Sequence, residues 1–591
     1  MTTASDDRSK TASKDCCLLS GNQAIARGAW EAGVEFGSGY PGTPSSEILP
    51  ALQELGVRHV EWSVNEKCAL EAAAGAMLTG TRALVTMKHV GVNVAADPLF
   101  TLAYTGVEAG LVLVAADDPD MHSSQNEQDS RHYGRAAQLP ILEPSDSQEA
   151  LELTRLAYEL SEEYDLPVLL RVTTRICHSD SVVAMGDRQQ RDQPCEPVTN
   201  PQKYVMIPAY ARRRNAARLE RWQDLRKYAD ETEINRVEPG DNSLGIICSG
   251  ATYQYVKEVA PDASVFKLGM AWPLPERQLC EFADSVERVV VLEESGPFLT
   301  DSIRALGIQV TSLPASVALG ELSPGRVAAL LGGEDVQAPM PSDDLPPRPP
   351  VLCPGCPHRA VFVTLRKLKL YVNGDIGCYT LGTLPPLSAL HTCLCMGAGI
   401  GQAHGINSVC EEKRSVAVIG DSTFVHSGIT GLINIVYNGG DTVVLILDNG
   451  TTAMTGGQEH PGTGVTLSGQ SSPRLSLEGI CRATGVDMVT VVDPVDLPAL
   501  EQALRDALAH ERPAVIIARR PCVLISRDRR PPYQIDENTC IQCGLCLRLG
   551  CPAIGVDQGQ PWIDAELCVG CGLCAQVCPT NAIRNVDVTD Q

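Results

Sequence analysis

Eight cysteines near the C-terminus fall into two similarly spaced runs, and no other feature of the sequence constrains the fold as strongly. In the second run, two residues separate each of the first three cysteines, three precede the fourth, and a proline follows: Cys568, Cys571, Cys574 and Cys578. The first run differs only in having four residues before its last member: Cys540, Cys543, Cys546 and Cys551. Runs of this kind hold [4Fe–4S] clusters, with three ligands from one run and the fourth from the other.

The spacing therefore predicts two clusters with defined ligands. One is held by Cys540, Cys543, Cys546 and Cys578, and the other by Cys568, Cys571, Cys574 and Cys551. Paired zinc knuckles are the alternative, but zinc sites usually separate two Cys-x2-Cys units by a longer interval. Residues 531–588 are expected to form an α+β two-cluster ferredoxin domain, in which the longer interval before Cys551 extends one loop and leaves the number of ligands unchanged.

Composition limits the class of protein. The chain has 591 residues, enough for several domains. Its formal net charge of −24 argues against nucleic-acid binding. Its 23 cysteines lie in a chain with no export signal, which favours cluster ligation over disulfides and a cytoplasmic location. No apolar run is long enough to span a bilayer, and Met1–Lys14 is expected to be a disordered extension.

Short apolar strands alternate with helical patterns through the rest of the chain. This rhythm predicts a multidomain α/β protein with doubly wound parallel sheets. The expected order is a first α/β block at 18–185, a polar linker and helix at 186–240, a connecting domain at 241–335, a proline-rich break at 333–350 and a further α/β block at 350–527. Expected strands are Ala83–Met87, Gly110–Ala115, Pro167–Val172, Leu244–Ser249, Val289–Glu293, Ser415–Gly420, Thr442–Leu447 and Ala514–Ala518, and expected helices are Lys67–Leu78 and Ala211–Glu231.

Two short motifs end consecutive strands of the 350–527 block. They are Gly420-Asp421-Ser422 and, after 25 intervening residues, Asp448-Asn449-Gly450. A carboxylate and an amide at the ends of neighbouring parallel strands can bind one Mg²⁺, which bridges two phosphates. Asp421, the Asn449 side chain and the Thr451 carbonyl are the predicted ligands, while Gly420 lets backbone N–H groups approach phosphate. The motif pair is close to the thiamine diphosphate signature; an ordinary strand end with a turn asparagine is the alternative.

The N-terminal block carries a complementary set of motifs. Tyr40–Glu47 (YPGTPSSE) resembles a motif of 2-oxoacid:ferredoxin oxidoreductases, and Glu66, at the start of an Ala- and Gly-rich helix, matches the thiamine-activating glutamate of that family. Further segments resemble the alpha subunits of indolepyruvate:ferredoxin oxidoreductases: Met87–Asn93, Ala116–Pro119, Ser123–Asp129, Leu352–Arg359 and Thr452–Gln458. The resemblance runs from about residue 18 to 585, and the four-residue interval before Cys551 is also typical of that family.

The resemblance implies an enzyme dependent on thiamine diphosphate and Mg²⁺ that converts aryl pyruvates such as indolepyruvate to arylacetyl-CoA and CO2. CoA is the implied co-substrate, ferredoxin the electron acceptor, and a smaller beta subunit with a gamma-type domain the partner. Glu66 is implied to hydrogen-bond the aminopyrimidine ring of the cofactor, and Thr43 is a candidate substrate contact. Gly377 and Ser422 are candidate cofactor contacts. Candidates for the substrate pocket are Lys88, His89, Gln458 and His460, although Lys88 and His89 could equally stabilise a loop.

Four further cysteines resemble the ligands of a proximal cluster in related enzymes: Cys353, Cys356, Cys378 and Cys522. The alternative is that Cys353–Cys356 is a tight turn and Cys522 a small buried residue. Cys68, Cys248 and Cys481 lie in apolar patterns and are expected in the core.

Three other functions remain open. The substrate could be another 2-oxoacid such as pyruvate, because the spacing of motifs does not define an aryl pocket. A non-oxidative thiamine-dependent decarboxylase would have no use for a ferredoxin tail. An electron-transfer adaptor with inactive thiamine folds is disfavoured because Glu66, Asp421 and Asn449 are all present. Whether the thiamine site lies within or between chains is not decided by the sequence.

Overall fold

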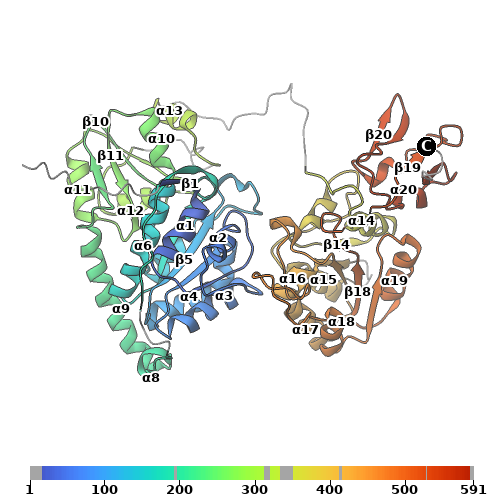
Figure 1. The fold of residues 1–591 in the computed structure, drawn as a ribbon, viewed down its shortest axis with the longest axis horizontal. Coiled ribbons are helices and arrows are strands. Elements are labelled where there is room, and N and C mark those ends of the chain that lie inside the picture. Colours follow the sequence, from blue (N-terminus) through green and yellow to red (C-terminus); the bar gives the residue numbers. More distant parts are fainter. Residues whose placement is uncertain are drawn as a thin grey trace, which may run out of the picture. The chain divides into compact units, whose positions relative to one another are not determined.

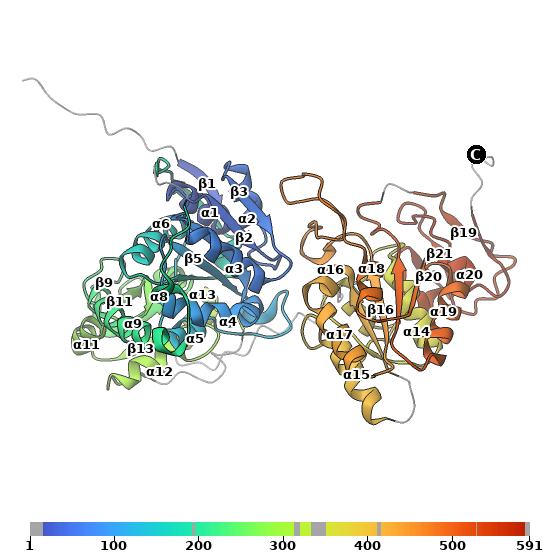
Figure 2. The same ribbon diagram turned by 90° about the horizontal axis from the view of Figure 1, so that it is seen from below.

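The computed structural model describes residues 16–191, 196–311, 320–332, 350–410, 415–526 and 529–585. Contacts divide the chain into two compact units, Met1–Pro341 and Ser342–Gln591, which are described separately (Figure 1, Figure 2). The expected extension Met1–Lys14 and residues 333–349 of the proline-rich break lie outside the described residues. Across the described ranges, none of the helices combines the length and apolar character that a membrane span requires.

The larger sheet of the first unit has seven strands in the order β12-β6-β7-β5-β4-β2-β3, parallel except at β12. Strands β4, β5 and β7 are buried throughout, as expected for a parallel sheet covered on both faces. They confirm three expected strands. The bounds are β2 (Phe36–Gly39), β3 (His59–Trp62), β4 (Ala83–Lys88), β5 (Leu111–Asp117), β6 (Ile141–Leu142), β7 (Val168–Thr173) and β12 (Met270–Trp272).

The order of these strands reverses between β2 and β4. The two are neighbours, but the chain visits the edge strand β3 between them. Open α/β sheets bind ligands outside the carboxyl ends of the strands at such a reversal. The helices of this part are α1 (Gly21–Glu31), α2 (Ile48–Glu54), α3 (Glu66–Met77), α4 (His89–Thr105), α5 (Arg131–Ala137), α6 (Ser147–Glu163) and α7 (Thr174–His178), and a separate ribbon pairs β1 (Cys16–Ser20) with β8 (Asp180–Ala184).

A second sheet of the first unit has the order β13-β10-β11-β9. It is preceded by α8 (Pro201–Tyr204) and the long helix α9 (Pro208–Ala229), which confirms the expected Arg-rich helix. The strands are β9 (Arg236–Glu238), β10 (Asp241–Ser249), β11 (Ala263–Leu268) and β13 (Val289–Leu292), and the helices are α10 (Thr252–Val259), α11 (Glu276–Asp284), α12 (Phe298–Ala305) and α13 (Pro324–Gly332). Since β12 follows β11 in the chain but pairs with β6, this segment joins the two sheets.

The second unit is built on five parallel strands in the order β14-β15-β16-β18-β17. Along β15, Val416 and Val418 enter the apolar cluster on one face, while Ala417 and Ile419 enter the cluster on the other. The alternation places helices on both faces. The elements are β14 (Tyr371–Asn373), β15 (Ser415–Gly420), β16 (Val443–Asp448), β17 (Met488–Val492), β18 (Ala514–Arg519), α14 (Pro357–Lys367), α15 (Ala398–Val409), α16 (Asp421–Thr423), α17 (Ile429–Tyr437), α18 (Leu477–Ala483) and α19 (Leu497–Ala509).

The cysteine-rich tail is a small α+β domain in the same unit. Its end strands β19 (Tyr533–Ile535) and β22 (Ile583–Asn585) pair antiparallel, and β20 (Ile554–Asp557) with β21 (Gln560–Ile563) forms a hairpin. The helix α20 (Leu573–Gln576) lies within the second cysteine run and contains Cys574. Gln576 hydrogen-bonds the backbone of Val495 and Leu497 at the start of α19. The tail therefore packs directly on the five-stranded domain.

Candidate functional site

Glu66 is the first residue of helix α3, and Asn65 before it caps the helix. The Asn65 side chain accepts a hydrogen bond from the Cys68 N–H at 2.9 Å, which fixes the first turn. Glu66 is only 5% exposed. Gly91 of α4 packs so closely against it that a Cβ at this position would lie 2.6 Å from Glu66 Cγ. Glycine at residue 91 therefore makes room for the Glu66 carboxyl between the two helices.

Lys88 ends β4 and His89 begins α4, next to the strand reversal, and both contact the loop after β5. Lys88 Nζ donates to the Ser123 carbonyl at 3.0 Å and to its hydroxyl at 3.1 Å, and burial lowers the pKa of Lys88 to about 8. His89 Nε2 lies 3.2 Å from the Asn126 carbonyl. The Ser123 hydroxyl also reaches the carbonyl of Thr43 at 3.4 Å. These contacts favour the loop-stabilising role of Lys88 and His89.

In the second unit, the predicted Mg²⁺ ligands lie at the carboxyl ends of adjacent strands. Asp421 follows β15 and Asn449 follows β16. Asp421 Oδ2 accepts the Gly450 N–H at 2.9 Å, and Asn449 Oδ1 accepts the Thr451 N–H at 3.1 Å. Gly450 has φ +71°, a left-handed conformation that suits glycine. The turn thus brings the carboxylate, the amide and the Thr451 backbone together.

His460 lies at this group of oxygens. Its Nε2 is 3.3 Å from Asp421 Oδ2, and its Nδ1 accepts the Gly462 N–H at 3.1 Å, which places the ring proton on Nε2. That Nε2 is buried and has no hydrogen-bond partner among the described residues. A buried donor without a partner is rare unless a ligand satisfies it. Together with the oxygen donors beside it, this fits an anionic group such as a Mg²⁺-bound diphosphate.

His358 is a member of the same cluster that the sequence motif did not identify as functional. It lies in the first turn of α14, and the Asn449 Nδ2 is 3.4 Å from its Nε2. Burial lowers the pKa of His358 to about 4, so the ring is neutral. His358 comes two residues after Cys356 in the segment Leu352–Arg359, which resembles a family motif, and this position is the sequence feature that could have identified it.

Asp375 is a second residue that sequence reasoning missed. It follows β14, the neighbour of β15, and is fully buried. Its carboxylate accepts the N–H groups of Ile376 at 2.7 Å and Gly397 at 2.6 Å, and burial raises its pKa to about 7. Gly377 packs against the ring of Tyr379, where a Cβ would collide. Packing therefore accounts for a glycine at this position, and the cofactor contact of Gly377 stays a prediction.

Three other positions of the motifs have identified hydrogen-bond or ion-pair partners. The carboxylate of Asp448 pairs with Arg519 Nε at 2.6 Å, which explains an acid at that position. The Ser422 hydroxyl accepts from Thr452 at 3.0 Å. The Gln458 side chain bonds the hydroxyl and carbonyl of Thr455, so it is engaged within its own loop.

The four cysteines of the possible third cluster lie near one another around the start of α14. Burial raises the pKa of Cys356 to about 12, with the neighbouring Cys353 and Cys378 thiols adding to the effect. The pKa of Cys378 is raised by burial and then by Cys522 and Cys353. The Cys522 N–H donates to the Asn449 carbonyl at 2.9 Å. This group therefore adjoins the Asp421–Asn449 cluster.

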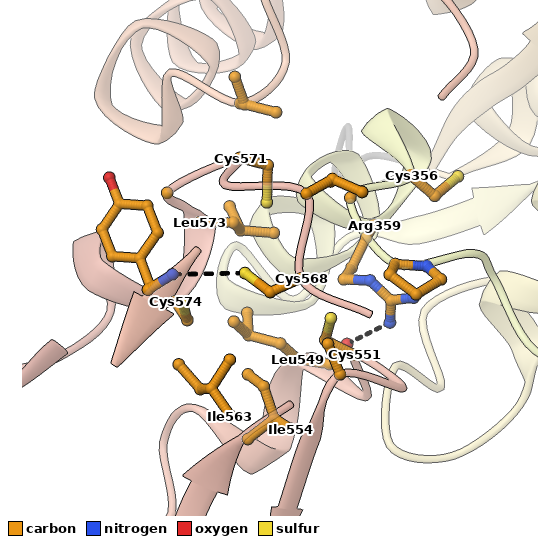
Figure 3. A pocket seen from close by; sticks show the side chains of 17 residues that line it. Cys356, Arg359, Leu549, Cys551, Ile554, Ile563, Cys568, Cys571, Leu573 and Cys574 are labelled. Carbon is orange, nitrogen blue, oxygen red and sulfur yellow. Dashed lines mark hydrogen bonds between the residues drawn. The ribbon is translucent and has the colours of Figure 1, made fainter. Parts of the chain in front are cut away.

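The eight cysteines of the tail surround two separate cavities. One cavity is lined by Cys540, Cys543, Cys546 and Cys578, and the other by Cys551, Cys568, Cys571 and Cys574. Figure 3 shows the second cavity, whose lining also includes Cys356 and Arg359. In the described part of the chain, no three His, Cys, Asp or Glu side chains converge as the ligands of a single metal ion would. Four thiols around a cavity fit a cubane, because each thiolate binds a different iron.

The expected core cysteines are only partly as predicted. Cys248 and Cys481 are fully buried. Cys68 is partly exposed, because it lies in the first turn of α3 on the side away from the sheet-facing Ala69 and Leu70. The prediction of a core position for Cys68 was therefore wrong.

Family models match three parts of the chain. Residues 27–238 match "Pyruvate flavodoxin/ferredoxin oxidoreductase, thiamine diP-bdg", residues 375–518 match "Thiamine pyrophosphate enzyme, C-terminal TPP binding domain", and residues 561–584 match "4Fe-4S binding domain". The chain is thus similar to thiamine-binding oxidoreductases in its first unit, to thiamine pyrophosphate enzymes in its second, and to iron–sulfur proteins in its tail.

Curated relatives match the chain over almost its whole length. Proteins named indolepyruvate oxidoreductase subunit IorA are 43% identical in Archaeoglobus fulgidus, 44% in Methanothermobacter marburgensis and 40% in Pyrococcus abyssi. Each alignment covers 96% of this chain and 97% of the relative.

Proposed function

The chain belongs to the family of indolepyruvate oxidoreductase IorA subunits, and from this we propose that it oxidises an aryl pyruvate such as indolepyruvate. As a family member it is a thiamine-diphosphate-dependent 2-oxoacid:ferredoxin oxidoreductase with iron–sulfur clusters. In the proposed reaction the 2-oxoacid and the CoA thiol give the acyl-CoA, CO2, one proton and two electrons. Two ferredoxin molecules each accept one electron.

The observation that carries this proposal is a contact within the second unit between a candidate cluster ligand and a candidate Mg²⁺ ligand. Cys522, a candidate ligand of an iron–sulfur cluster, donates its N–H to the carbonyl of Asn449, a candidate ligand of the diphosphate-bound Mg²⁺. Chemistry at the thiamine site and removal of electrons would then occur in adjoining parts of one compact unit. A non-oxidative decarboxylase would have no need of this contact.

Each unit carries residues suited to one end of the cofactor. Thiamine diphosphate supplies, when bound, a carbon nucleophile for the 2-oxo group and a sink for the electron pair left by CO2. Glu66 would hold a proton in a hydrogen bond to the aminopyrimidine ring, and its buried position excludes water from that bond. Asp421, Asn449 and the Thr451 carbonyl would hold Mg²⁺ at the diphosphate.

His460 is assigned here to the diphosphate and not to the substrate. Its Nε2 lies 3.3 Å from Asp421 Oδ2 and would donate a hydrogen bond to a phosphate oxygen of the bound cofactor. Thr43 remains the candidate contact to the substrate, since its backbone is tied to Ser123 at the strand reversal.

We assign three clusters to the chain. One is held by Cys353, Cys356, Cys378 and Cys522 beside the thiamine site. The second is held by Cys551, Cys568, Cys571 and Cys574, and the third by Cys540, Cys543, Cys546 and Cys578. Cys543 is exposed, and Ile541 beside it is 63% exposed. Electrons would therefore leave at the loop that contains Cys540–Leu545.

The substrate is tested with the assembled enzyme, co-purified anaerobically with its smaller beta subunit. Indolepyruvate, phenylpyruvate and pyruvate are compared as donors, with CoA and ferredoxin present. We expect the highest kcat/KM with an aryl pyruvate and formation of the matching acyl-CoA. A preference for pyruvate would overturn the substrate assignment, and CO2 release without ferredoxin reduction would overturn the oxidative reaction.

Two measurements test the sites. Glu66→Gln should abolish oxoacid-dependent dye reduction while the visible absorbance of the clusters stays unchanged, and undiminished turnover would refute the role of Glu66. Iron analysis of the alpha chain should give about twelve irons for three clusters, whereas about eight would exclude the cluster at Cys353.

A further inference from the structure

The irregular interval Cys546-x4-Cys551 has a specific structural use. Its last two residues, Leu549 and Gly550, direct their carbonyl oxygens to one amino group of Arg359, Nη1, at 2.7 and 2.5 Å. Arg359 lies in α14, in the five-stranded domain, and is 2% exposed. The lengthened loop of the ferredoxin domain is therefore bound by a buried guanidinium of the neighbouring domain (Figure 3).

The other amino group of Arg359 binds the backbone of the segment that precedes α14. Its Nη2 donates to the carbonyl of Leu352 at 2.7 Å and to that of Cys353 at 3.2 Å. The guanidinium is a rigid planar fork, so four carbonyls bound to it are held in one fixed arrangement. Lysine, with a single ammonium group, cannot reproduce this geometry. Arg359 thus joins the backbone beside Cys551 to the backbone of Cys353.

Gly550 is what allows the loop to meet Arg359. Its φ is +64°, in the left-handed region, and a Cβ there would lie 2.6 Å from Pro386 Cδ. The left-handed residue ends the short turn Leu547–Leu549 and brings two consecutive carbonyls to the same side. The second run has three residues in the matching interval, one fewer than the loop that presents both carbonyls here.

A second close contact lies beside this one. Gly355, with φ +72°, packs against Val569 of the second cysteine run, where a Cβ would collide with the valine side chain. Cys356 and Arg359 both line the cavity that Cys551, Cys568, Cys571 and Cys574 surround. The Cys353–Cys356 loop and this cavity are therefore in direct contact.

We propose that Arg359 and the lengthened loop at Leu549–Gly550 form a junction that fixes the path of electrons between the cluster at Cys353 and the cluster at Cys551. The inference rests on the clusters of the proposed function. In each step the first cluster is oxidised by one electron and the second is reduced by one, with no bond formed and no proton transferred. The rate of such a step falls steeply with distance, so a rigid junction keeps it fast. The positive charge also stabilises the reduced, more negative clusters.

The test compares Arg359→Met and Arg359→Lys with Arg366→Met. Arg366 is a matched control because it lies two turns further along α14 and its guanidinium also contacts the loop, at the Arg548 carbonyl at 3.2 Å. Cluster midpoint potentials are measured by electron paramagnetic resonance during a redox titration with mediators, which needs no oxoacid. Cluster reduction by indolepyruvate is then followed by stopped-flow absorbance.

We expect Arg359→Met to shift the midpoint potential of the cluster at Cys353 or of the cluster at Cys551 to more negative values. Arg366→Met should leave both potentials unchanged. Arg359→Lys keeps the charge, so its potentials should stay closer to wild type while oxoacid-driven reduction slows at least tenfold. Wild-type potentials and wild-type reduction rates in both Arg359 variants would overturn the junction. If Arg359→Met binds less iron than wild type, the rate of oxoacid-driven cluster reduction in Arg359→Lys becomes the test of the junction. A wild-type enzyme that is not reduced by any 2-oxoacid would instead sink the proposed function, without bearing on the potentials.

Discussion

His460 Nε2 lies 3.3 Å from Asp421 Oδ2, and both side chains are buried at the carboxyl edge of the parallel sheet. Asp421 is a predicted Mg²⁺ ligand, whereas His460 was expected in the substrate pocket. The imidazole proton has no hydrogen-bond partner among the described residues, so cofactor binding is the event that would satisfy it. This difference between a substrate role and a cofactor role can be measured.

We expect His460→Gln to weaken thiamine diphosphate binding in the presence of Mg²⁺ by roughly 10- to 100-fold, the range for a lost hydrogen bond to a charged group. Titration of the apoenzyme by calorimetry measures the dissociation constant directly. His404→Gln is the control, because His404 lies on α15 against Gly440, before the start of β16 and away from the carboxyl edge. Equal affinities of His460→Gln and wild type for thiamine diphosphate, with a raised KM for the oxoacid, would show that His460 contacts the substrate.

Gly91→Ala tests the position of Glu66 without changing its chemistry. The added methyl group would lie 2.6 Å from Glu66 Cγ and must displace the carboxyl. A misplacement of about 1 Å can cost about 100-fold in rate, so we expect oxoacid-driven dye reduction to fall by that order. Dithionite reduction of the clusters should not change.

Gly75→Ala is the matched control for Gly91→Ala. Gly75 lies in α3, the helix that Glu66 begins, and a Cβ there has no atom within 4 Å. Alanine should raise stability by up to about 1 kcal/mol through helix propensity and leave activity unaffected. If Gly91→Ala behaved like Gly75→Ala in both assays, close packing of Glu66 would not matter for the reaction.

Much of the fold could be predicted because parallel strands are apolar and regularly spaced. The expected strand at 415–420 is β15, and the expected strands at 442–447 and 514–518 are β16 and β18 within one residue. The short strand β12 was not predicted, because three residues carry little periodicity and its partner β6 is far away in sequence. Pairing of this kind depends on tertiary contacts alone.

The site was less predictable than the fold. Asp421 and Asn449 stand at motif positions, so spacing alone predicts them as Mg²⁺ ligands. Asp375 and His358 have no such spacing, and only the order of strands and the start of α14 bring them to the same edge. The roles of Lys88 and Arg359 depend on which carbonyls their side chains reach, and a sequence does not contain that information.

Glu294 gives the first unit a predicted pH dependence. Its Oε1 accepts the Leu322 N–H at 2.8 Å, and burial raises its pKa from 4.5 to about 7 even though Arg171 and Arg131 lower it, while Glu321 raises it further. The folded state therefore favours the protonated carboxyl. The resulting stabilisation is complete below about pH 4.5, the unfolded value, and is lost as the pH rises through 7.

We expect Glu294→Gln, which stays neutral, to be more stable than wild type at pH 8 by up to about 3 kcal/mol and to match it near pH 5. Thermal unfolding followed by calorimetry at the two pH values measures the difference. Glu281→Gln, at an exposed position of α11 paired with Arg277, is the control and should show no such divergence. A Glu294→Gln variant that loses stability equally at both pH values would show that the carboxyl is ionised in the folded protein.

Ile541→Asp tests where electrons leave the chain. Ile541 and Leu545 are exposed on the loop that carries Cys543, also exposed, whereas none of the four cysteines around the other cavity is exposed. Transient electron-transfer contacts are small, so one charged residue in an apolar contact should raise the KM for ferredoxin roughly tenfold. Reduction of a small viologen dye should be unaffected because it needs no protein interface. Val556→Asp places the same charge at a 54% exposed position on β20, outside the cysteine loop, and should leave both rates unchanged. An unaltered KM for ferredoxin in Ile541→Asp would mean that ferredoxin takes its electrons elsewhere.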